Sequence, residues 1–398
     1  MTDPRTTARA LFTAGVAAAD PAAAVTRHIT AVTSPAQIIA VGKAAVQMAG
    51  AALAAFPGVP ARVVTNYENA SDLPGATVMA AGHPVPDANG AAAAASVLAD
   101  LEVTTGPVLA LISGGGSALL PAPVAGVSLA DKALLNSLLL AAGLDITQMN
   151  LVRQQVSRVK GGGLLRAAAP HPVTALILSD VIGDDLSTIA SGPTAPPIGT
   201  AAEAVATLQA AGIWAQVPDS IKAHLAAAPA AGPLPEHQNI LVGSNAISVA
   251  AMAAQAPGAR VLAPVEGDVA DAARAICDQA GPGVTLWGGE TTVQIKGTGR
   301  GGRNQELALR IALEAQARGW TEFTCLQGGS DGRDGPTDAA GGLVDHGTLA
   351  RIAAAGADVQ ALLANNDSYA ALDAGGDLLI TGATGTNVAD LGVLIREP

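Results

Sequence analysis

The glycine-rich segment at 297–306, GTGRGGRNQE, carries two arginines, Arg300 and Arg303, in a chain that is poor in positive charge. It follows an expected strand at 291–296 and precedes an expected helix at 304–316. A guanidinium fork can bind two phosphate or carboxylate oxygens at once. We therefore interpret this loop, with Asn304 at its end, as a site for a multiply charged anion. A flexible charged loop without a ligand is the simpler alternative.

The same segment also matches the G-x-G-x-x-G fingerprint of dinucleotide-binding proteins, at Gly297, Gly299 and Gly302. That match would indicate a hydride-transfer enzyme. The fingerprint also needs an acidic residue about 20 residues further on. Here that distance falls within or just beyond the expected helix, and no strand ends there in an acid. We therefore rank the anion-binding interpretation above the dinucleotide one.

A second glycine-rich turn, SGGGS, directly follows an apolar run and opens a helix. Consecutive glycines let backbone N–H groups converge on an anion, and a helix start adds partial positive charge. A tight packing turn is the alternative, but it would need fewer glycines. We predict a phosphate or carboxylate site here, formed by Ser113, Gly114, Gly115, Gly116 and Ser117.

Lys43 follows the apolar run 37–41 and a single glycine, Gly42. A cation is slightly unfavourable at a helix start, because that end of the helix is itself partly positive. A ligand would explain its position, since an ammonium can offset charge on a transferring phosphoryl group. An ordinary exposed lysine is the competing interpretation.

Carboxylates also collect where strands are expected to end. Such groups suit Mg²⁺, which binds through one or two carboxylates together with water and phosphate oxygens. One of them could also accept the proton of an attacking hydroxyl. For each aspartate alone, a turn or a helix cap is the simpler explanation, and only the clustering favours a site. The acids are Asp180, Asp184, Asp185, Glu290, Asp331, Asp334 and Asp338.

These residues must be positioned by the apolar, β-branched runs that alternate with alanine-rich stretches along the chain. Short continuous apolar runs that end in glycine predict parallel sheets covered by helices on both faces, a three-layer α/β architecture. In such sheets, ligands bind at the carboxyl ends of the strands. The expected strands are 37–41, 108–113, 173–179, 239–244, 259–264, 284–290, 291–296, 323–329 and 378–384.

The segment 228–238, APAAGPLPEHQ, has the composition of a linker. We therefore predict an N-terminal Rossmann-like domain of residues 1–235 and a smaller C-terminal α/β domain of residues 236–398. A single large domain is the alternative.

The overall composition excludes several classes of function. A net charge of −12 without a basic stripe argues against nucleic-acid binding. Cys277 and Cys325 form no metal-binding spacing, so we expect reduced core thiols. We find no signal peptide and no run of about 18 apolar residues, and we expect a cytoplasmic protein without a membrane span. A homodimer is compatible with the sequence.

Eight ordered segments resemble the bacterial and archaeal glycerate 2-kinase family, over about residues 5 to 397. That family includes tartrate-operon proteins long labelled hydroxypyruvate reductase. It joins an N-terminal α/β domain to a C-terminal leucine-rich (MOFRL) domain, with the active site in the cleft between them. The segments are VGKAA, AGHPVPDANG, LISGGGSALLPAP, NLVRQQVSRVKGGGLLRAA, SDVIGDDLSTIASGPTAP, GGETTVQIKGTGRGGRNQELAL, GSDGRDGPTDAAGG and TGATGTNVADL.

The resemblance implies transfer of a phosphoryl group from ATP to the 2-hydroxyl of D-glycerate, with Mg²⁺. It implies that Lys43 and Arg303 are the essential catalytic cations. It also implies that Asp180, or Asp184, and Glu290 are the acids for metal and substrate, with Asp180 and Glu290 as the metal ligands.

On this basis we expect direct in-line transfer. An aspartate would orient or deprotonate the 2-hydroxyl, and Arg300 or Arg153 would bind the carboxylate of glycerate. An NAD(P)H-dependent hydroxypyruvate reductase and a non-catalytic anion-binding protein are the alternatives. The expected substrate- and nucleotide-binding residues are Gly42, Ser113, Gly114, Gly115, Gly116, Ser117, Arg153, Asp184, Glu290, Arg300, Asn304 and Asp331.

Overall fold

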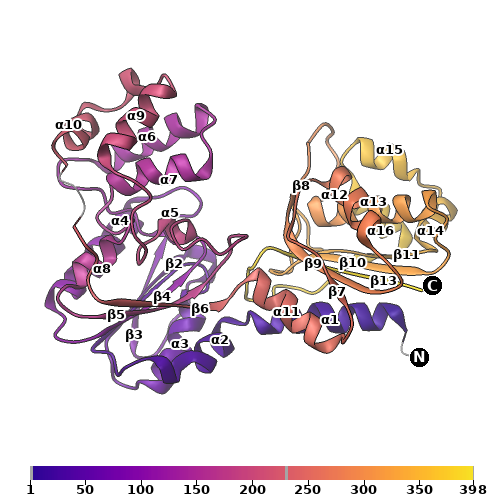
Figure 1. Ribbon diagram of the computed structural model, residues 1–398, viewed down its shortest axis with the longest axis horizontal. Coiled ribbons are helices and arrows are strands. Elements are labelled where there is room, and N and C mark those ends of the chain that lie inside the picture. The colour runs from indigo at the N-terminus through magenta and orange to yellow at the C-terminus, as the bar shows by residue number, and fades with distance from the viewer. Residues whose placement is uncertain (1–2, 229–231, 398) are drawn as a thin grey trace. The chain divides into compact units, whose positions relative to one another are not determined.

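The computed structural model describes residues 3–228 and 232–397. These residues form two compact units, each built on one sheet with its own helices (Figure 1). The parallel-sheet unit comprises Pro21–Ser179 and Asp184–Val242. The mixed-sheet unit comprises the described residues up to Asp20, together with Asp180–Gly183 and those from Gly243 onward.

The sheet of the parallel-sheet unit has the strand order β3-β2-β1-β4-β5-β6. The neighbours among β1 to β5 pair in parallel. This is the Rossmann order, which reverses direction between β1 and β4. Every residue of β1 and β4 is buried, as expected for a sheet covered on both faces. The strands are β1 (Gln37–Val41), β2 (Ala61–Asn66), β3 (Ala76–Ala81), β4 (Val108–Ser113), β5 (Val173–Leu178) and β6 (His237–Gly243).

Helices cover both faces of this sheet (Figure 1). The helices α2 (Pro21–His28) and α3 (Ala45–Ala55) lie on one face, and α4 (Ala88–Val103), α5 (Gly116–Leu119) and α8 (Gly163–Ala168) lie on the other. The predicted strands at 37–41, 108–113, 173–179 and 239–244 are therefore confirmed, and so is the three-layer arrangement of this unit.

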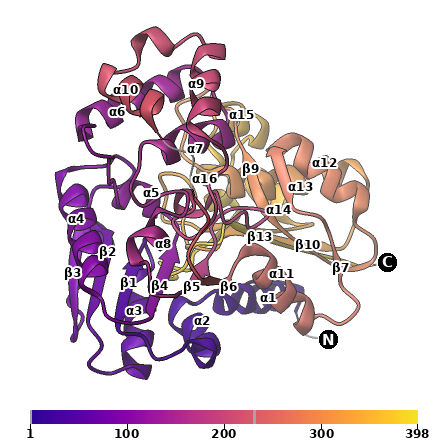
Figure 2. The same ribbon diagram turned by 60° about the vertical axis from the view of Figure 1, so that its left-hand side comes forward.

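Four further helices of this unit form a helical subdomain with a hydrophobic core of its own (Figures 1 and 2). Leu135, Leu139, Val152, Leu208 and Ile221 lie in that core. The sequence analysis did not predict the subdomain as a separate packing group. The helices are α6 (Leu129–Ala141), α7 (Ile146–Gln155), α9 (Ala201–Ala210) and α10 (Asp219–Ala227).

The sheet of the mixed-sheet unit has the order β12-β11-β10-β13-β9-β7, with β8 also paired to β9. Most of its neighbours are antiparallel, so the prediction of parallel sheets throughout was wrong for this unit. The strand predicted at 284–290 continues to Thr292 as one strand, β9, with Glu290 inside it, and residues 293–296 of the strand predicted at 291–296 are not in a strand. The strands are β7 (Arg260–Val261), β8 (Val265–Asp268), β9 (Gly283–Thr292), β10 (Phe323–Gly329), β11 (Gly341–Asp345), β12 (Leu378–Leu379) and β13 (Asp390–Arg396).

Helices also cover both faces of this second sheet (Figure 1). On one face Leu11 and Phe12 of α1 (Pro4–Ala18) pack with Met252 of α11 (Asn245–Gln255). The other face carries α12 (Val269–Gln279), α13 (Arg303–Ala317), α14 (Thr348–Ala354), α15 (Val359–Ala364) and α16 (Ser368–Gly375). No helix of the described chain is both long and apolar enough to span a bilayer.

The packing of α1 departs from the predicted division at residues 235 and 236. That division assigns α1 to the N-terminal domain, whereas α1 packs on the second sheet. Its apolar residues recur every three or four positions, and this stripe is what the sheet covers. Residues 229–231 of the expected linker 228–238 lie outside the described residues.

Candidate functional site

Gly42 and Lys43 leave β1 beside the end of β4, where the strand order reverses. The Lys43 N–H donates to the Gly114 carbonyl at 2.9 Å, and the Ala44 N–H donates to Ser113 Oγ at 3.1 Å. Gly42 has φ +128°, and a Cβ there would lie 2.1 Å from Ser113 Oγ. Only glycine fits such a contact. The two segments predicted from sequence therefore meet at the switch point of the sheet, and Ser113 joins them.

The side chain of Lys43 is half-buried and close to the glycine-rich turn. A Cβ on Gly115, which has φ +85°, would lie 3.1 Å from Lys43 Cγ and 3.2 Å from the His83 ring. Within the described residues, 3–228 and 232–397, no group forms a hydrogen bond or an ion pair with the Lys43 ammonium. That ammonium is therefore available to an anionic ligand.

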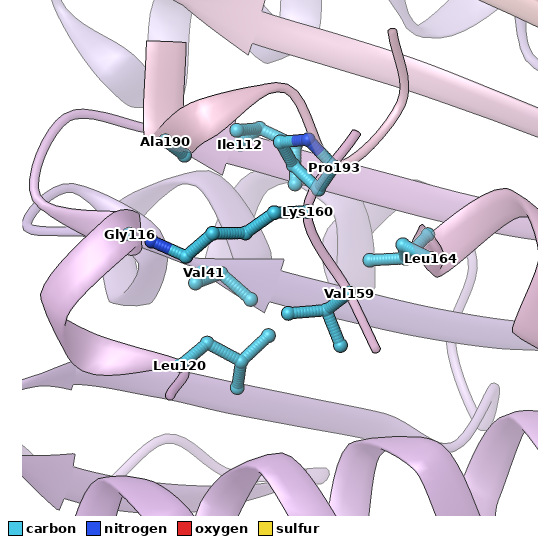
Figure 3. Close-up of a pocket in the computed structure, with 9 residues that line it drawn as sticks. All are labelled: Val41, Ile112, Gly116, Leu120, Val159, Lys160, Leu164, Ala190 and Pro193. Atoms are coloured by element: carbon cyan, nitrogen blue, oxygen red, sulfur yellow. The ribbon is translucent and has the colours of Figure 1, made fainter. Parts of the chain in front are cut away.

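A lysine that the sequence analysis did not select, Lys160, lies behind the same turn. It is 5% exposed, and its ammonium donates to the Ser117 carbonyl at 3.0 Å, to Ser191 Oγ at 3.3 Å and to Ser117 Oγ. Figure 3 shows its aliphatic stem crossing an apolar pocket and its ammonium beside Gly116. Burial lowers the pKa of Lys160 well below its usual value, and the charges of Lys132 and Arg153 lower it further. The only signal in the sequence was a lysine followed by three glycines.

The chain after β5 is strained where it meets this turn. Asp184, Ala190 and Ser191 have φ values of +56°, +51° and +62°, which non-glycine residues rarely adopt. A Cβ on Gly116 would lie 2.9 Å from that of Ala190, so the strained segment packs closely on the turn. Backbone strain of this kind concentrates at ligand-binding sites.

The predicted acids differ in what their oxygens contact. Asp185 accepts hydrogen bonds from Ser187 and Thr188, and Asp331 accepts one from the N–H of Arg333 at 2.9 Å, so both act in local turns. Asp180 lies just beyond β5. Asp184 has a buried Oδ1 without a hydrogen-bond partner in the described chain. Asp184 is therefore the acid of this segment with free acceptor capacity.

In the mixed-sheet unit, Arg303 at the start of α13 binds a carboxylate that the sequence analysis missed. Its Nε and Nη2 donate to the two oxygens of Asp390 at 2.7 and 3.1 Å, and its Nη1 lies 3.0 Å from Glu290. Burial lowers the pKa of Arg303, but the bonds and charge of Asp390 raise it by more. Burial also raises the pKa of Asp390 despite the arginine.

In this structure the Nε–Nη2 edge of the Arg303 guanidinium binds Asp390 rather than a ligand, and the role of Arg303 at an anion stays a prediction. Asp390 begins the central strand β13, where its neighbours in register are Gly289 of β9 and Gly329 of β10. Asn304, predicted to bind substrate or nucleotide, is 1% exposed and donates to Asp390 at 2.9 Å. Asn304 is therefore a positioning residue in this structure.

Asp334 holds the start of α13 through backbone N–H groups. It accepts hydrogen bonds from the N–H groups of Asn304 at 3.1 Å and Gln305 at 2.8 Å. Burial raises its pKa to about 6, against the effect of these bonds. A Cβ on Gly302 would lie 2.3 Å from the Asp334 carboxyl carbon, which explains the glycine before the helix.

The loop at 297–302 uses its glycines and N–H groups to pack on the segment 365–368. The N–H of Gly299 donates to the Asn365 carbonyl at 2.9 Å, and the N–H of Arg300 donates to Asp367 Oδ1 at 3.1 Å. The side chain of Arg300 is exposed, with its guanidinium 5.0 Å from the centre of the Tyr369 ring. These backbone donors are occupied, so the loop does not provide the N–H cradle of a dinucleotide fingerprint.

Arg153, the other arginine expected at the substrate, is half-buried on α7. Its Nη2 donates to Asn136 of α6, and burial lowers its pKa. It forms no ion pair with a carboxylate in the part of the chain that the structure describes.

Comparison with known proteins agrees with this geometry. Residues 7–226 match the family model described as a domain of unknown function, DUF4147, and residues 283–390 match the MOFRL family. A D-glycerate 2-kinase from Thermotoga maritima is 39% identical over 380 residues, which cover 89% of this chain and 89% of that protein. The chain belongs to the glycerate 2-kinase family.

Two further proteins are similar to this chain over almost its whole length. A crystal structure of glycerate kinase from Thermotoga maritima is 36% identical, has a TM-score of 0.92 and covers 98% of this chain and 99% of its own. A protein from Agrobacterium vitis that carries the name hydroxypyruvate reductase is 40% identical over 97% of this chain and 93% of its own length. Family membership therefore leaves two activities to be weighed against the geometry.

Proposed function

We propose that this chain is an ATP-dependent glycerate 2-kinase that transfers a phosphoryl group to the 2-hydroxyl of D-glycerate and yields 2-phospho-D-glycerate. The observation that carries this proposal is the family match over both units, with an unpaired lysine beside a glycine-rich turn at the switch point of the parallel sheet. Ligands bind at that point in doubly wound sheets.

The geometry favours the kinase over the reductase. In a nucleotide-binding Rossmann sheet the dinucleotide fingerprint follows the first strand. Here β1 is followed by Gly42 and Lys43 without such a fingerprint, and the matching loop at 297–302 is packed on another segment. A lysine suits phosphoryl transfer, whereas hydride transfer needs no cation at this position.

In the proposed reaction Lys43 and Arg303 offset negative charge that develops on the transferring group. The turn at Gly114–Ser117 contributes backbone N–H groups to a phosphate. Asp180 or Asp184 orients the 2-hydroxyl of glycerate and accepts its proton. Glu290 and Asp390 keep the guanidinium of Arg303 in one orientation.

The residues present fit a magnesium ion bound largely through the nucleotide. Across the described residues, no group of three or more histidines, cysteines or acids could hold a metal alone. Mg²⁺ commonly takes one or two carboxylates together with substrate phosphates. Asp180 and Glu290 are the predicted ligands, and the unpartnered oxygen of Asp184 is a further donor. When bound, the ion would neutralise charge on the β- and γ-phosphates.

A phosphorus NMR spectrum of the full chain with ATP, D-glycerate and magnesium tests the proposal. We expect a signal of 2-phosphoglycerate and the release of ADP. Parallel incubation with hydroxypyruvate and NADH should leave the NADH absorbance unchanged. NADH consumption without phosphoglycerate would favour the reductase, and 3-phosphoglycerate would overturn the assigned position. A cytoplasmic location and a homodimer stay predictions from the sequence.

A further inference from the structure

Three cations other than Lys43 lie close to one another in the parallel-sheet unit. They are Lys132 on α6, Arg153 on α7 and Lys160 behind the glycine-rich turn, and we call them the cationic cluster. The charge of Arg153 lowers the pKa of Lys132, and the charges of Lys132 and Arg153 both lower the pKa of Lys160. In the described parts of the chain, no carboxylate pairs with any of the three.

A chain of hydrogen bonds holds the cluster in place. Lys160 donates to Ser117 and Ser191, whose Oγ atoms are 2.9 Å apart. Ser191 in turn donates to Asn150 Oδ1 at 3.0 Å, one helical turn before Arg153 on α7. The ammonium of Lys160 is thus fixed to the glycine-rich turn on one side and to α7 on the other.

Lys132 is the member of the cationic cluster whose charge is not stabilised by a hydrogen bond in the described chain. Its Nζ is buried and has no hydrogen-bond partner in the described chain. Burial lowers its pKa to about 8, and the charge of Arg153 acts in the same direction. A buried unpaired ammonium is costly, and cations of like sign add to that cost. Such an arrangement is expected where an anion completes the site.

We propose that the cationic cluster binds the carboxylate of the small 2-hydroxy acid substrate. A kinase acting on glycerate must hold two anions, a phosphate and a carboxylate. In the proposed reaction, Lys43 and the turn at Gly114–Ser117 interact with the phosphate. The cationic cluster is therefore assigned to the carboxylate. The choice of ligand rests on the proposed function. The inference of an anion site rests on the buried Lys132 ammonium, which has no hydrogen-bond partner in the described chain.

Lys132→Met tests this assignment, because methionine keeps most of the apolar stem and removes the charge. We expect the KM for D-glycerate to rise about tenfold or more, the scale of one lost charge-assisted hydrogen bond. The KM for ATP should change less than about twofold. The unfolding temperature should stay the same or rise, since an unpaired buried charge has been removed. Lys222→Met on α10 is the matched control, because this lysine is also partly buried (26% exposed) but is paired with Asp219.

The pH dependence gives a second readout that a structural role would not change. A carboxylate raises the pKa of Lys132 in the complex, so the wild-type KM for glycerate should rise as the pH passes above about 8, where the free protein loses this proton. Lys132→Met should lack that rise. Arg153→Gln provides a second variant if Lys132→Met does not fold.

The outcomes separate this inference from the proposed function. If the wild type phosphorylates glycerate but both variants keep its KM, the carboxylate assignment is wrong and the kinase assignment stands. A rise in the KM for ATP alone would also overturn it, because the cluster would then serve the nucleotide. If the wild type does not phosphorylate glycerate, the proposed function itself fails.

Discussion

Asp390 accepts hydrogen bonds from Nε and Nη2 of Arg303, so both donors on one edge of the guanidinium are bound to a single buried carboxylate. The remaining Nη1 lies against Glu290, whose side chain is 48% exposed. The guanidinium plane is therefore fixed before any ligand arrives. Preorganised charge of this kind is the usual source of transition-state stabilisation.

Arg303→Lys should lower kcat by about 100-fold or more and approach the loss in Arg303→Ala. Lysine keeps the charge but cannot bind Asp390 in a bidentate manner while also reaching Glu290. Steady-state kinetics should show a larger effect on kcat than on the KM for glycerate. Arg300→Lys, in the same loop but exposed, is the control, with kcat within about twofold of the wild type. Normal turnover in Arg303→Lys would mean that the loop only packs.

Lys43→Ala should also lower kcat by about 100-fold, because the unpaired ammonium at the switch point would be lost. Within the residues that the structure describes, the Lys43 ammonium forms no hydrogen bond or ion pair, so circular dichroism and the unfolding temperature should match the wild type. Lys222→Ala serves as the surface control and should keep full activity. A Lys43→Ala enzyme that turns over at the normal rate would remove this residue from the mechanism.

Loss of the proton from Asp334 should lower the free energy of unfolding as the pH rises from about 4 to about 6. Its pKa is raised from 3.8 to about 6 in the folded state, so the folded protein binds its proton more tightly than the unfolded chain does. This contribution to the free energy of unfolding is fully present below the pKa of the unfolded chain and is lost as the pH rises through the pKa of the folded protein. The free energy of unfolding changes by about 3 kcal/mol at most. Denaturant unfolding across this range should show the slope.

Asp334→Asn should remove that contribution to the slope, although the amide loses one of the two backbone bonds and the variant is less stable throughout. Asp373→Asn, which alters an exposed acid, is the control and should keep the wild-type slope. Equal slopes in all three proteins would show that Asp334 titrates normally.

Removal of divalent metal should stop phosphoryl transfer without unfolding the protein. The expected metal is held mainly by nucleotide phosphates and is not a folding element. With excess EDTA the rate should drop to background, the unfolding curve should not move, and added Mg²⁺ should restore activity. Full activity in EDTA, or unfolding by EDTA, would contradict this picture.

The parallel sheet could be predicted from sequence, because its central strands β1 and β4 are short apolar runs followed by glycine. The mixed sheet could not, since an apolar run does not encode the direction of its neighbour. Glu290 illustrates the consequence: its Gly-Gly-Glu context resembles a strand end, but β9 continues beyond it.

Two residues of the candidate site, Lys160 and Asp390, were not predicted from the sequence, for different physical reasons. Lys160 is a lysine in a polar-looking segment, and only the fold shows that its ammonium is buried behind the turn. Asp390 lies at the beginning of a strand, whereas the rule for parallel sheets predicts ligand sites at the carboxyl ends of strands. In an antiparallel sheet the start of one strand lies beside the ends of its neighbours, so both kinds of position reach the same edge.

The packing of α1 on the second sheet has a consequence for synthesis on the ribosome. Helix α1 is made before the parallel-sheet unit, whereas α11, β10 and β13, which cover Leu11 and Phe12, are made after it. Domains generally fold in the order in which they are made. Here the nascent chain must carry an uncovered apolar helix until the whole parallel-sheet unit has been made, and the mixed-sheet unit closes on a helix made well before its strands.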